Sequence, residues 1–297
     1  MSIFKAYDIR GIYPEEINEG VAERLGRAIA KYLKTTVVVG RDTRLSSQSL
    51  FQSIARGINE EGYDVVDVGV IDTPGLYFAT AHYGFGAGVM ITASHNPKEY
   101  NGLKICREEA IPVGSDSGLK EIEELFNSMP VFSDSKRRGK IAEKDVMDDY
   151  ADHLMRFYRG GGDGTVIDCS NGASARIVHK LLERGLRLEV INDEMDGNFP
   201  AHEPNPLKEE NMQQLKEKSG DGLGVCFDGD GDRVGVVYGG ETIRNDFLTA
   251  VIATEMLREN PGATVLYDLR SSRIVREEIE RAGGKALMCR VGHAFIR

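Results

Sequence analysis

The stretch TVVVGRDTRLSS, residues 36–47, joins a short apolar run to a polar turn that leads into a helix-like segment. The same pattern returns as TVIDCSNGASA at residues 165–175 and as TVLYDLRSSR at residues 264–273. A pattern that recurs along a chain predicts repeated structural units. We therefore expect three related units in this protein.

A second β-rich run follows each of these stretches after a helical segment. These runs are GYDVVDVGV (residues 62–70), GLRLEVIND (185–193) and GKALMCRVGH (284–293). In the helical segment SLFQSIARGINEEG, residues 49–62, apolar side chains recur at three and four positions and a Gly closes the segment. Short apolar strands that alternate with helices are typical of parallel sheets covered on both faces. The predicted fold class is α/β, with repeated three-layer α/β/α domains and mostly parallel mixed sheets.

A third strand is expected in the first two units only. GAGVMI (residues 86–91) ends in the loop TASHNP, and LGVCF (residues 223–227) ends in DGDGDR. The third unit reaches Arg297 without such a strand, so we expect an incomplete third domain and no fourth domain. The expected boundaries are residues 1–140 for domain I, 141–242 for domain II and 243–297 for the partial domain III.

Composition and charge exclude several classes of protein. The chain of 297 residues is 41% hydrophobic, and its net charge is −10, with no concentration of Lys and Arg that would bind a nucleic-acid backbone. No apolar run approaches membrane-spanning length, and the N-terminus lacks the apolar core of a signal peptide. The four cysteines show no paired metal-ligand spacing and are expected to be buried free thiols. We expect a cytoplasmic protein without nucleic-acid or membrane partners.

The loop DGDGDR places Asp228, Asp230 and Asp232 at alternate positions, separated by glycines that let the backbone bend. Oxygen-only ligands of this kind suit Mg²⁺. An EF-hand calcium loop would need Glu at its twelfth position, where this chain has Gly239. An acidic turn between two strands is the plain structural alternative.

The loop TASHNP places the hydroxyl of Ser94 on a turn at a strand end, with His95 beside it. The nucleophile elbow of serine hydrolases has the pattern G-x-S-x-G, which the residues around Ser94 do not provide. A serine that only caps a turn is the alternative. Because functional loops of open α/β sheets gather at the carboxyl ends of strands, this loop and the aspartate loop should face a common crevice.

Together the two loops favour phosphoryl chemistry. A phosphorylated serine carries about −1.5 to −2 charges, and three aspartates would repel it unless a divalent cation lay between them. A phosphoserine next to Mg²⁺ is therefore self-consistent. Positioned cations and donors would align the attacking hydroxyl. The candidates for those roles are Arg10, Lys104, Arg233 and His95.

Four motifs resemble those of the α-D-phosphohexomutase superfamily, and within it the phosphomannomutase/phosphoglucomutase branch more than the phosphoglucosamine mutases. They are AYDIRG (residues 6–11), GRDTRLSS (40–47), TASHNPKEYNGLK (92–104) and DGDGDR (228–233). The resemblance spans essentially the whole chain. It implies an isomerase that interconverts the 1- and 6-phosphates of mannose or glucose, with a hexose 1,6-bisphosphate as intermediate and activator.

The resemblance also implies roles for individual residues. Ser94 would carry the phosphoryl group, and Asp228, Asp230 and Asp232 would bind one Mg²⁺ per chain together with the phosphorylated Ser94.

Other residues would assist transfer or bind the substrate. Arg10 and Lys104 would assist proton transfer and position phosphate, and His95 would line the same pocket. Tyr7, Arg233, Arg270 and His293 would contact the hexose phosphate, as the resemblance places them.

Two family motifs do not occur in these residues. They are the Gly-Glu-x-Ser-Gly-His sugar loop of domain III and the phosphate-gripping loop of domain IV. We therefore expect impaired activity in this chain alone, or completion by a separately encoded C-terminal half. The alternatives are a non-catalytic fragment that binds Mg²⁺ and sugar phosphate, a phosphoglucosamine mutase, and a slow sugar-phosphate phosphatase.

Overall fold

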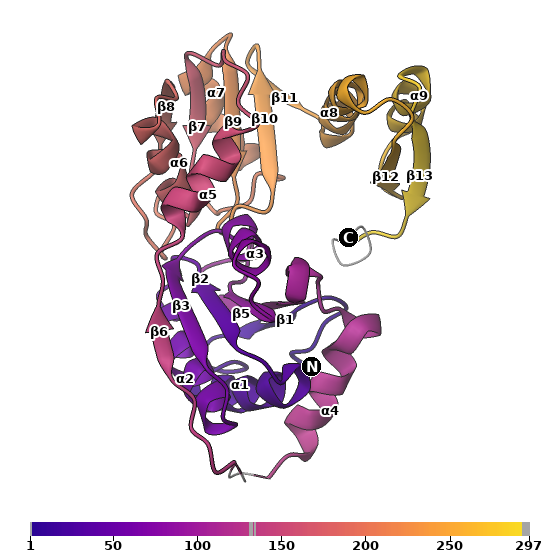
Figure 1. Ribbon diagram of the computed structural model, residues 1–297. Helices are drawn as coiled ribbons and strands as arrows, with labels where there is room; N and C mark the ends of the chain where they lie inside the picture. The colour runs from indigo at the N-terminus through magenta and orange to yellow at the C-terminus, as the bar shows by residue number, and fades with distance from the viewer. Residues whose placement is uncertain (1, 131–132, 134, 293–297) are drawn as a thin grey trace.

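The computed structural model describes residues 2–130, 133 and 135–292. Three α/β units follow one another along the chain (Figure 1): an indigo-to-magenta unit, a pink-to-orange unit and a smaller golden unit. Within the described residues, no helix combines the length and the apolar character needed to cross a membrane. The expectation of a repeated α/β/α fold with a short third unit is confirmed.

The first unit contains a sheet of six strands in the order β1-β5-β4-β2-β3-β6. Strand β2 pairs in parallel with β3 and β4, and β6 joins β3 in parallel, whereas β5 is antiparallel to both β4 and β1. The strands are β1 (Ile9–Ile12), β2 (Val37–Arg41), β3 (Val65–Val70), β4 (Ala87–Ile91), β5 (Tyr100–Arg107) and β6 (Ile141–Glu143). The helices are α1 (Glu19–Leu33), α2 (Ser47–Glu60), α3 (Thr73–His82) and α4 (Lys120–Ser128), with helical turns at Glu108–Ala110 and Ser115–Leu119.

The three layers follow from strands that are apolar on both faces. Val37 and Val39 of β2 pack into the core on the side of α1 and α2, whereas Val38 packs into the core that contains α3 and α5. All three side chains are fully buried. Alternate residues of a strand point to opposite faces, so an uninterrupted apolar strand needs helices on both sides.

The second unit repeats this plan with a sheet in the order β11-β10-β9-β7-β8. Strands β8, β7 and β9 are parallel, and β10 and β11 continue the sheet as antiparallel strands. The strands are β7 (Thr165–Asp168), β8 (Leu188–Ile191), β9 (Leu223–Phe227), β10 (Val234–Tyr238) and β11 (Glu241–Ile243). The helices are α5 (Met147–Met155), α6 (Ser174–Glu183) and α7 (Gln213–Ser219), with a 3₁₀ turn at Glu209–Met212.

As far as residue 292, the third unit contains two helices and two parallel strands. They are α8 (Asn245–Glu259), β12 (Thr264–Asp268), α9 (Arg273–Arg281) and β13 (Lys285–Cys289). Leu257 of α8 and Val275 and Ile279 of α9 form its small core. The predicted strand, helix and strand are confirmed. Leu287 and Met288 of β13 stay 54% and 52% exposed.

The four cysteines, all within the described part of the chain, are free thiols, as expected. Cys106, Cys169 and Cys226 are buried, and Cys289 is half-buried.

Helices α1 and α2 cross at two glycines that allow close contact. A Cβ atom added to Gly26 would lie 2.3 Å from the backbone oxygen of Ile54, and one added to Gly57 would lie 2.1 Å from that of Glu23. Both distances are far below a normal carbon–oxygen contact. The pair of glycines therefore sets how closely these two helices pack.

Replacing Gly57 by Ala should lower the free energy of unfolding by about 1–3 kcal/mol, because the extra methyl group forces the helices apart. Urea denaturation of both proteins measures this difference. Gly20→Ala in the exposed first turn of α1 is the matched control, since its Cβ would approach nothing closer than 3.5 Å. That substitution should be neutral or slightly stabilising. Equal effects of the two substitutions would contradict the packing argument.

Candidate active site

The Ser94 loop follows β4 and is held in an unusual backbone conformation. Ser94 has a φ of 53° and is only 1% exposed. Its backbone N–H donates to the hydroxyl of Thr92 at 2.8 Å. A non-glycine residue in the left-handed region costs about 1–3 kcal/mol, and such residues cluster at functional sites. The loop thus aims the Ser94 hydroxyl in a fixed direction.

The aspartate loop follows β9 in the second unit. Carboxylate oxygens of Asp228, Asp230 and Asp232 lie within 4.8 Å of one another, and Asp228 and Asp230 are fully buried. Gly231, with a φ of 69°, makes the turn that brings them together. Among the described atoms, the buried Oδ1 of Asp230 has no hydrogen-bond partner. Clustered, partly unsatisfied carboxylate oxygens fit Mg²⁺.

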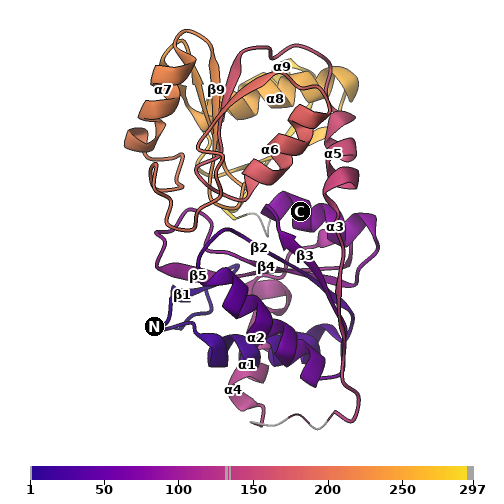
Figure 2. The same cartoon turned by 90° about the vertical axis from the view of Figure 1, so that its left-hand side faces the viewer.

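The two loops meet between the first and second units. The Ser94 hydroxyl donates to Oδ2 of Asp228 at 2.5 Å, across 134 residues of chain. Thr73, the first residue of α3, donates its hydroxyl to Oδ2 of Asp230 at 2.6 Å. Figures 1 and 2 both place α3 at the border between the sheet of the first unit and the second unit. The Ser94 loop and the aspartate loop therefore lie against each other at the border between the units.

Lys104 on β5 is the cation nearest the carboxylates. Its Nζ lies 2.6 Å from Oδ2 of Asp230 and 2.5 Å from Oδ2 of Asp232. Burial alone lowers the pKa of Lys104, but the charges of Asp230 and Asp232 outweigh burial and raise it. Lys104 is therefore a permanent ammonium group, and it joins the first unit to the second.

The carboxylates divide into two electrostatic types. Burial, followed by the neighbouring charge of Asp230, raises the pKa of Asp228 well above its usual value. Burial also acts to raise the pKa of Asp230, but the charge and hydrogen bond of Lys104 overcome it and lower that pKa. Asp228 is thus the stronger proton acceptor, and it is the carboxylate that contacts Ser94.

A histidine lies beside the Ser94 hydroxyl, and two arginines act electrostatically on this histidine. The Nδ1 atom of His95 lies 3.4 Å from Oγ of Ser94. Burial and then the positive charge of Arg233 lower the pKa of His95 to about 4. Arg10 on β1 donates to Oδ1 of Asn96 at 2.5 Å and forms an ion pair with Asp8 at 2.6 Å. The backbone N–H of Arg233 donates to Oδ1 of Asp228 at 3.0 Å.

The residues predicted to contact the sugar are less buried than Ser94, where the structure describes them. Tyr7 is half-buried. The hydrogen bond from Arg270 to Asp268 is the main cause that raises the pKa of Arg270. Arg270 follows β12 and its side chain is 70% exposed. His293 lies outside the described residues.

Sequence reasoning missed two residues that build the site, Arg44 and Thr73. The Arg44 side chain is fully buried, pairs with Asp42 at 3.0 Å and donates to the backbone oxygens of Ser94 at 2.9 Å and Asn96 at 2.7 Å. Two further donated bonds reach the backbone oxygens of Pro97 and Tyr100. The motif GRDTR was the only available signal for Arg44, and nothing local marks Thr73.

Arg44→Met should lower the free energy of unfolding by about 3–5 kcal/mol, because it leaves the buried Asp42 charge and several backbone oxygens without their partner. Denaturant titration measures the loss. The control is Arg56→Met, which removes an ion pair with Glu23 whose arginine side chain is 61% exposed. That loss should stay below about 1 kcal/mol. A small loss of unfolding free energy in Arg44→Met would show that the Ser94 loop keeps its conformation without Arg44.

The His95 pKa predicts a pH dependence. Its value is about 4 in the folded chain against the usual 6.5, so the unfolded chain binds more protons between these values. His95 therefore contributes to the free energy of unfolding above pH 6.5, and this contribution is lost as the pH falls toward 4. Denaturation across this range should show a smaller loss in His95→Gln than in the native chain. Identical pH profiles, or a His95 titration midpoint near 6.5 by NMR, would contradict the assignment.

Three family models match successive parts of this chain. Models of phosphoglucomutase/phosphomannomutase alpha/beta/alpha domains I, II and III match residues 1–130, 148–241 and 244–297. A phosphomannomutase of Escherichia coli strain K12 is 38% identical over 313 residues, covering 100% of this chain and 68% of the relative. A phosphomannomutase of Methanocaldococcus jannaschii is 39% identical, with the same coverage of 100% and 68%.

Solved structures agree as well. A phosphoglucomutase/phosphomannomutase family protein from Burkholderia thailandensis superposes with a TM-score of 0.90 at 33% identity, covering 99% of this chain and 67% of that one. The chain thus spans about two thirds of the length of these relatives. On the matched domains, the identities and the shared fold, this chain belongs to the phosphoglucomutase/phosphomannomutase family.

Proposed function

We propose that this chain moves a phosphoryl group between the 1- and 6-positions of a hexose phosphate, with Ser94 as the carrier. The observation that carries the proposal is the 2.5 Å contact between Oγ of Ser94 and Oδ2 of Asp228, inside a cluster of three carboxylates. The relatives are named phosphomannomutase or phosphomannomutase/phosphoglucomutase, so mannose and glucose phosphates are the substrates to test.

The proposed transfer proceeds in two phosphoryl-transfer steps. A hydroxyl of the bound hexose phosphate attacks the phosphorus carried on Ser94, the bond from phosphorus to Oγ breaks, and the hydroxyl proton ends on Oγ. The product is a hexose 1,6-bisphosphate. After the sugar reorients, Oγ attacks the other phosphoryl group, and the same proton returns to the oxygen that is released. Ser94 is then phosphorylated again, and the hexose phosphate has changed position.

Asp228, Asp230 and Asp232 would hold a Mg²⁺ ion together with the phosphate on Ser94, as their clustered oxygens support. When bound, this ion would offset the negative charge that collects around the transferring group. In the dephosphorylated chain, Asp228 accepts a hydrogen bond from the Ser94 hydroxyl, which keeps Oγ pointed at the carboxylate cluster. Lys104 supplies the permanent positive charge on the side of the first unit.

Neighbouring side chains would position the reactants. With its pKa held at about 4, His95 is neutral near pH 7, and its ring nitrogen beside Oγ can accept a proton from an attacking hydroxyl. Arg10 is anchored by Asp8 and Asn96 and would bind phosphoryl oxygens of the substrate. Arg233 would do the same from the second unit. Tyr7, which is half-buried, and Arg270, which is exposed, would form the outer wall toward the sugar.

We further propose that full turnover needs a C-terminal segment that completes the third unit, either on the same chain or on a separately encoded one. The support is the two-stranded sheet of this unit, whose Leu287 and Met288 are more than half exposed. Such a segment would hold the sugar. Positioning accounts for ~7–11 kcal/mol of a barrier in favourable cases, so these residues alone should transfer phosphoryl groups to Ser94 far better than they turn over substrate.

Incubation of the chain with Mg²⁺ and glucose 1,6-bisphosphate should phosphorylate Ser94, and intact-mass measurement should show the addition of one phosphoryl group. Ser94→Ala should abolish it, together with any turnover of mannose or glucose 1-phosphate. Omitting Mg²⁺ should slow the labelling strongly, because the three carboxylates would then repel the phosphate.

Ser174→Ala is the matched control. Ser174 is 2% exposed, and its hydroxyl lies beside the aspartate loop without a hydrogen-bond partner among the described atoms. This variant should still be labelled. If Ser94→Ala is labelled as fully as the native chain, Ser94 is not the carrier and the proposal fails.

A further inference from the structure

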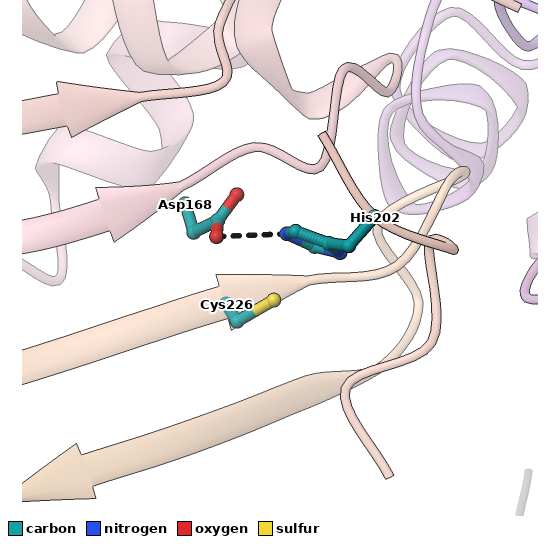
Figure 3. Close-up of side chains that lie close together, drawn as sticks. All are labelled: Asp168, His202 and Cys226. Carbon is teal, nitrogen blue, oxygen red and sulfur yellow. Dashed lines mark hydrogen bonds and ion pairs between the residues drawn. The ribbon is translucent and has the colours of Figure 1, made fainter. Parts of the chain in front are cut away.

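A second group of ligand-type side chains lies in the second unit, outside the proposed active site. Asp168 ends β7, Cys226 lies in β9, and His202 belongs to the segment between β8 and the Glu209–Met212 turn. One oxygen, one sulfur and one ring nitrogen of these residues lie within 4.8 Å of one another (Figure 3). Asp168 and Cys226 are fully buried, and the His202 side chain is 9% exposed. We call these three residues the Asp-His-Cys cluster.

The hydrogen-bond partners of His202 call for one more proton, or a cation, than a neutral imidazole and a carboxylate supply. Its Nδ1 lies 2.8 Å from the backbone oxygen of Glu203, and its Nε2 lies 3.0 Å from Oδ2 of Asp168. Both partners are acceptors. A neutral imidazole has one N–H, so it can satisfy only one of them. Either a second proton or a metal ion must therefore lie between Nε2 of His202 and Oδ2 of Asp168.

The surroundings of the cluster are those of a metal site. The Nδ1 atom of His202 is held by a backbone oxygen, which leaves Nε2 facing the carboxylate and the thiol. Oδ1 of Asp168 accepts from the backbone N–H of Ser170 at 2.9 Å and from Nδ2 of Asn192 at 3.0 Å, which leaves Oδ2 facing the cluster. Metal-binding histidines and carboxylates in proteins are usually fixed by outer hydrogen bonds of this kind.

The ligand types select the metal. A mixed set of nitrogen, oxygen and sulfur suits Zn²⁺ and excludes Mg²⁺, which prefers oxygen alone. A thiolate, a carboxylate and a neutral imidazole balance the charge of a divalent ion, so the buried assembly would be neutral. The hydroxyl of Ser170 lies 3.4 Å from Sγ of Cys226 and offers a neutral fourth ligand. Sγ also lies 3.6 Å from the backbone oxygen of Phe227, and the Ser170 hydroxyl lies 2.6 Å from the same oxygen.

We propose that the Asp-His-Cys cluster binds a structural Zn²⁺ ion. The ion would connect the ends of β7 and β9 to the segment that carries His202. Strand β9 runs directly into Asp228, and a Cβ atom added to Gly229 would lie 3.5 Å from Pro204, two residues after His202. The zinc site would thus hold in place the two segments that contact the aspartate loop, β9 and the segment around Pro204. It does not depend on the phosphoryl transfer proposed above.

Metal content measures the site directly. The full chain is expressed in zinc-supplemented medium, dialysed against a chelator and returned to Mg²⁺ buffer. Its metal content is then measured by inductively coupled plasma mass spectrometry. The native chain should retain one Zn²⁺ per chain. Cys226→Ala and His202→Gln should each lower the retained zinc by at least about tenfold. Cys169→Ala, which removes an equally buried thiol one residue from Asp168, should retain it.

Cobalt distinguishes this cluster from the aspartate loop. Co²⁺ bound to a thiolate gives a sulfur-to-metal charge-transfer absorption in the near ultraviolet, which an all-oxygen site cannot give. The native chain and Asp232→Asn should both show this absorption, and Cys226→Ala should not. The native-chain spectrum does not rely on any variant folding. Absence of the thiolate band in the native chain, or zinc retention that is lost in Asp232→Asn and kept in Cys226→Ala, would overturn the proposal.

Discussion

Charge repulsion among three converging carboxylates is the constraint on which the arrangement of the first two units depends. Asp228 and Asp230 are fully buried, and the charge that opposes them comes from Lys104 on a strand of the other unit. Buried charges are tolerated only when they are paired and hydrogen-bonded. The second unit can therefore present its aspartate loop only while it is docked against the first.

The Ser94 loop illustrates the same dependence at shorter range. Its backbone carries a left-handed serine, a conformation that would relax in an isolated peptide. Arg44 prevents this relaxation because one guanidinium group, itself held by Asp42, binds several backbone oxygens of the loop. Strand β4 sets the direction in which the Ser94 loop leaves the sheet, and Arg44 keeps the loop rigid.

The sequence predicted those features that leave a local pattern. Apolar strands, helical periodicity and the two polar loops were readable, and the position of both loops after third strands indicated that they would meet. The contacts of Thr73 left no such pattern, because its hydroxyl reaches a carboxylate 157 positions away. The motif around Arg44 was visible, but not its contact with a backbone oxygen 50 positions away. The Asp-His-Cys cluster was invisible for the same reason: its members are separated by more than twenty residues, and only the sheet brings β7 and β9 side by side.

The position of Lys104 has a mechanical consequence. Its three N–H donors are shared between two carboxylates of the second unit, so the ammonium acts as a latch between the units. In the transfer proposed above, an incoming phosphate would offer oxygens to the same donors. Phosphate binding and cohesion between the units would then draw on one ammonium group, so a ligand that took up some of these donors would weaken the contact between the units.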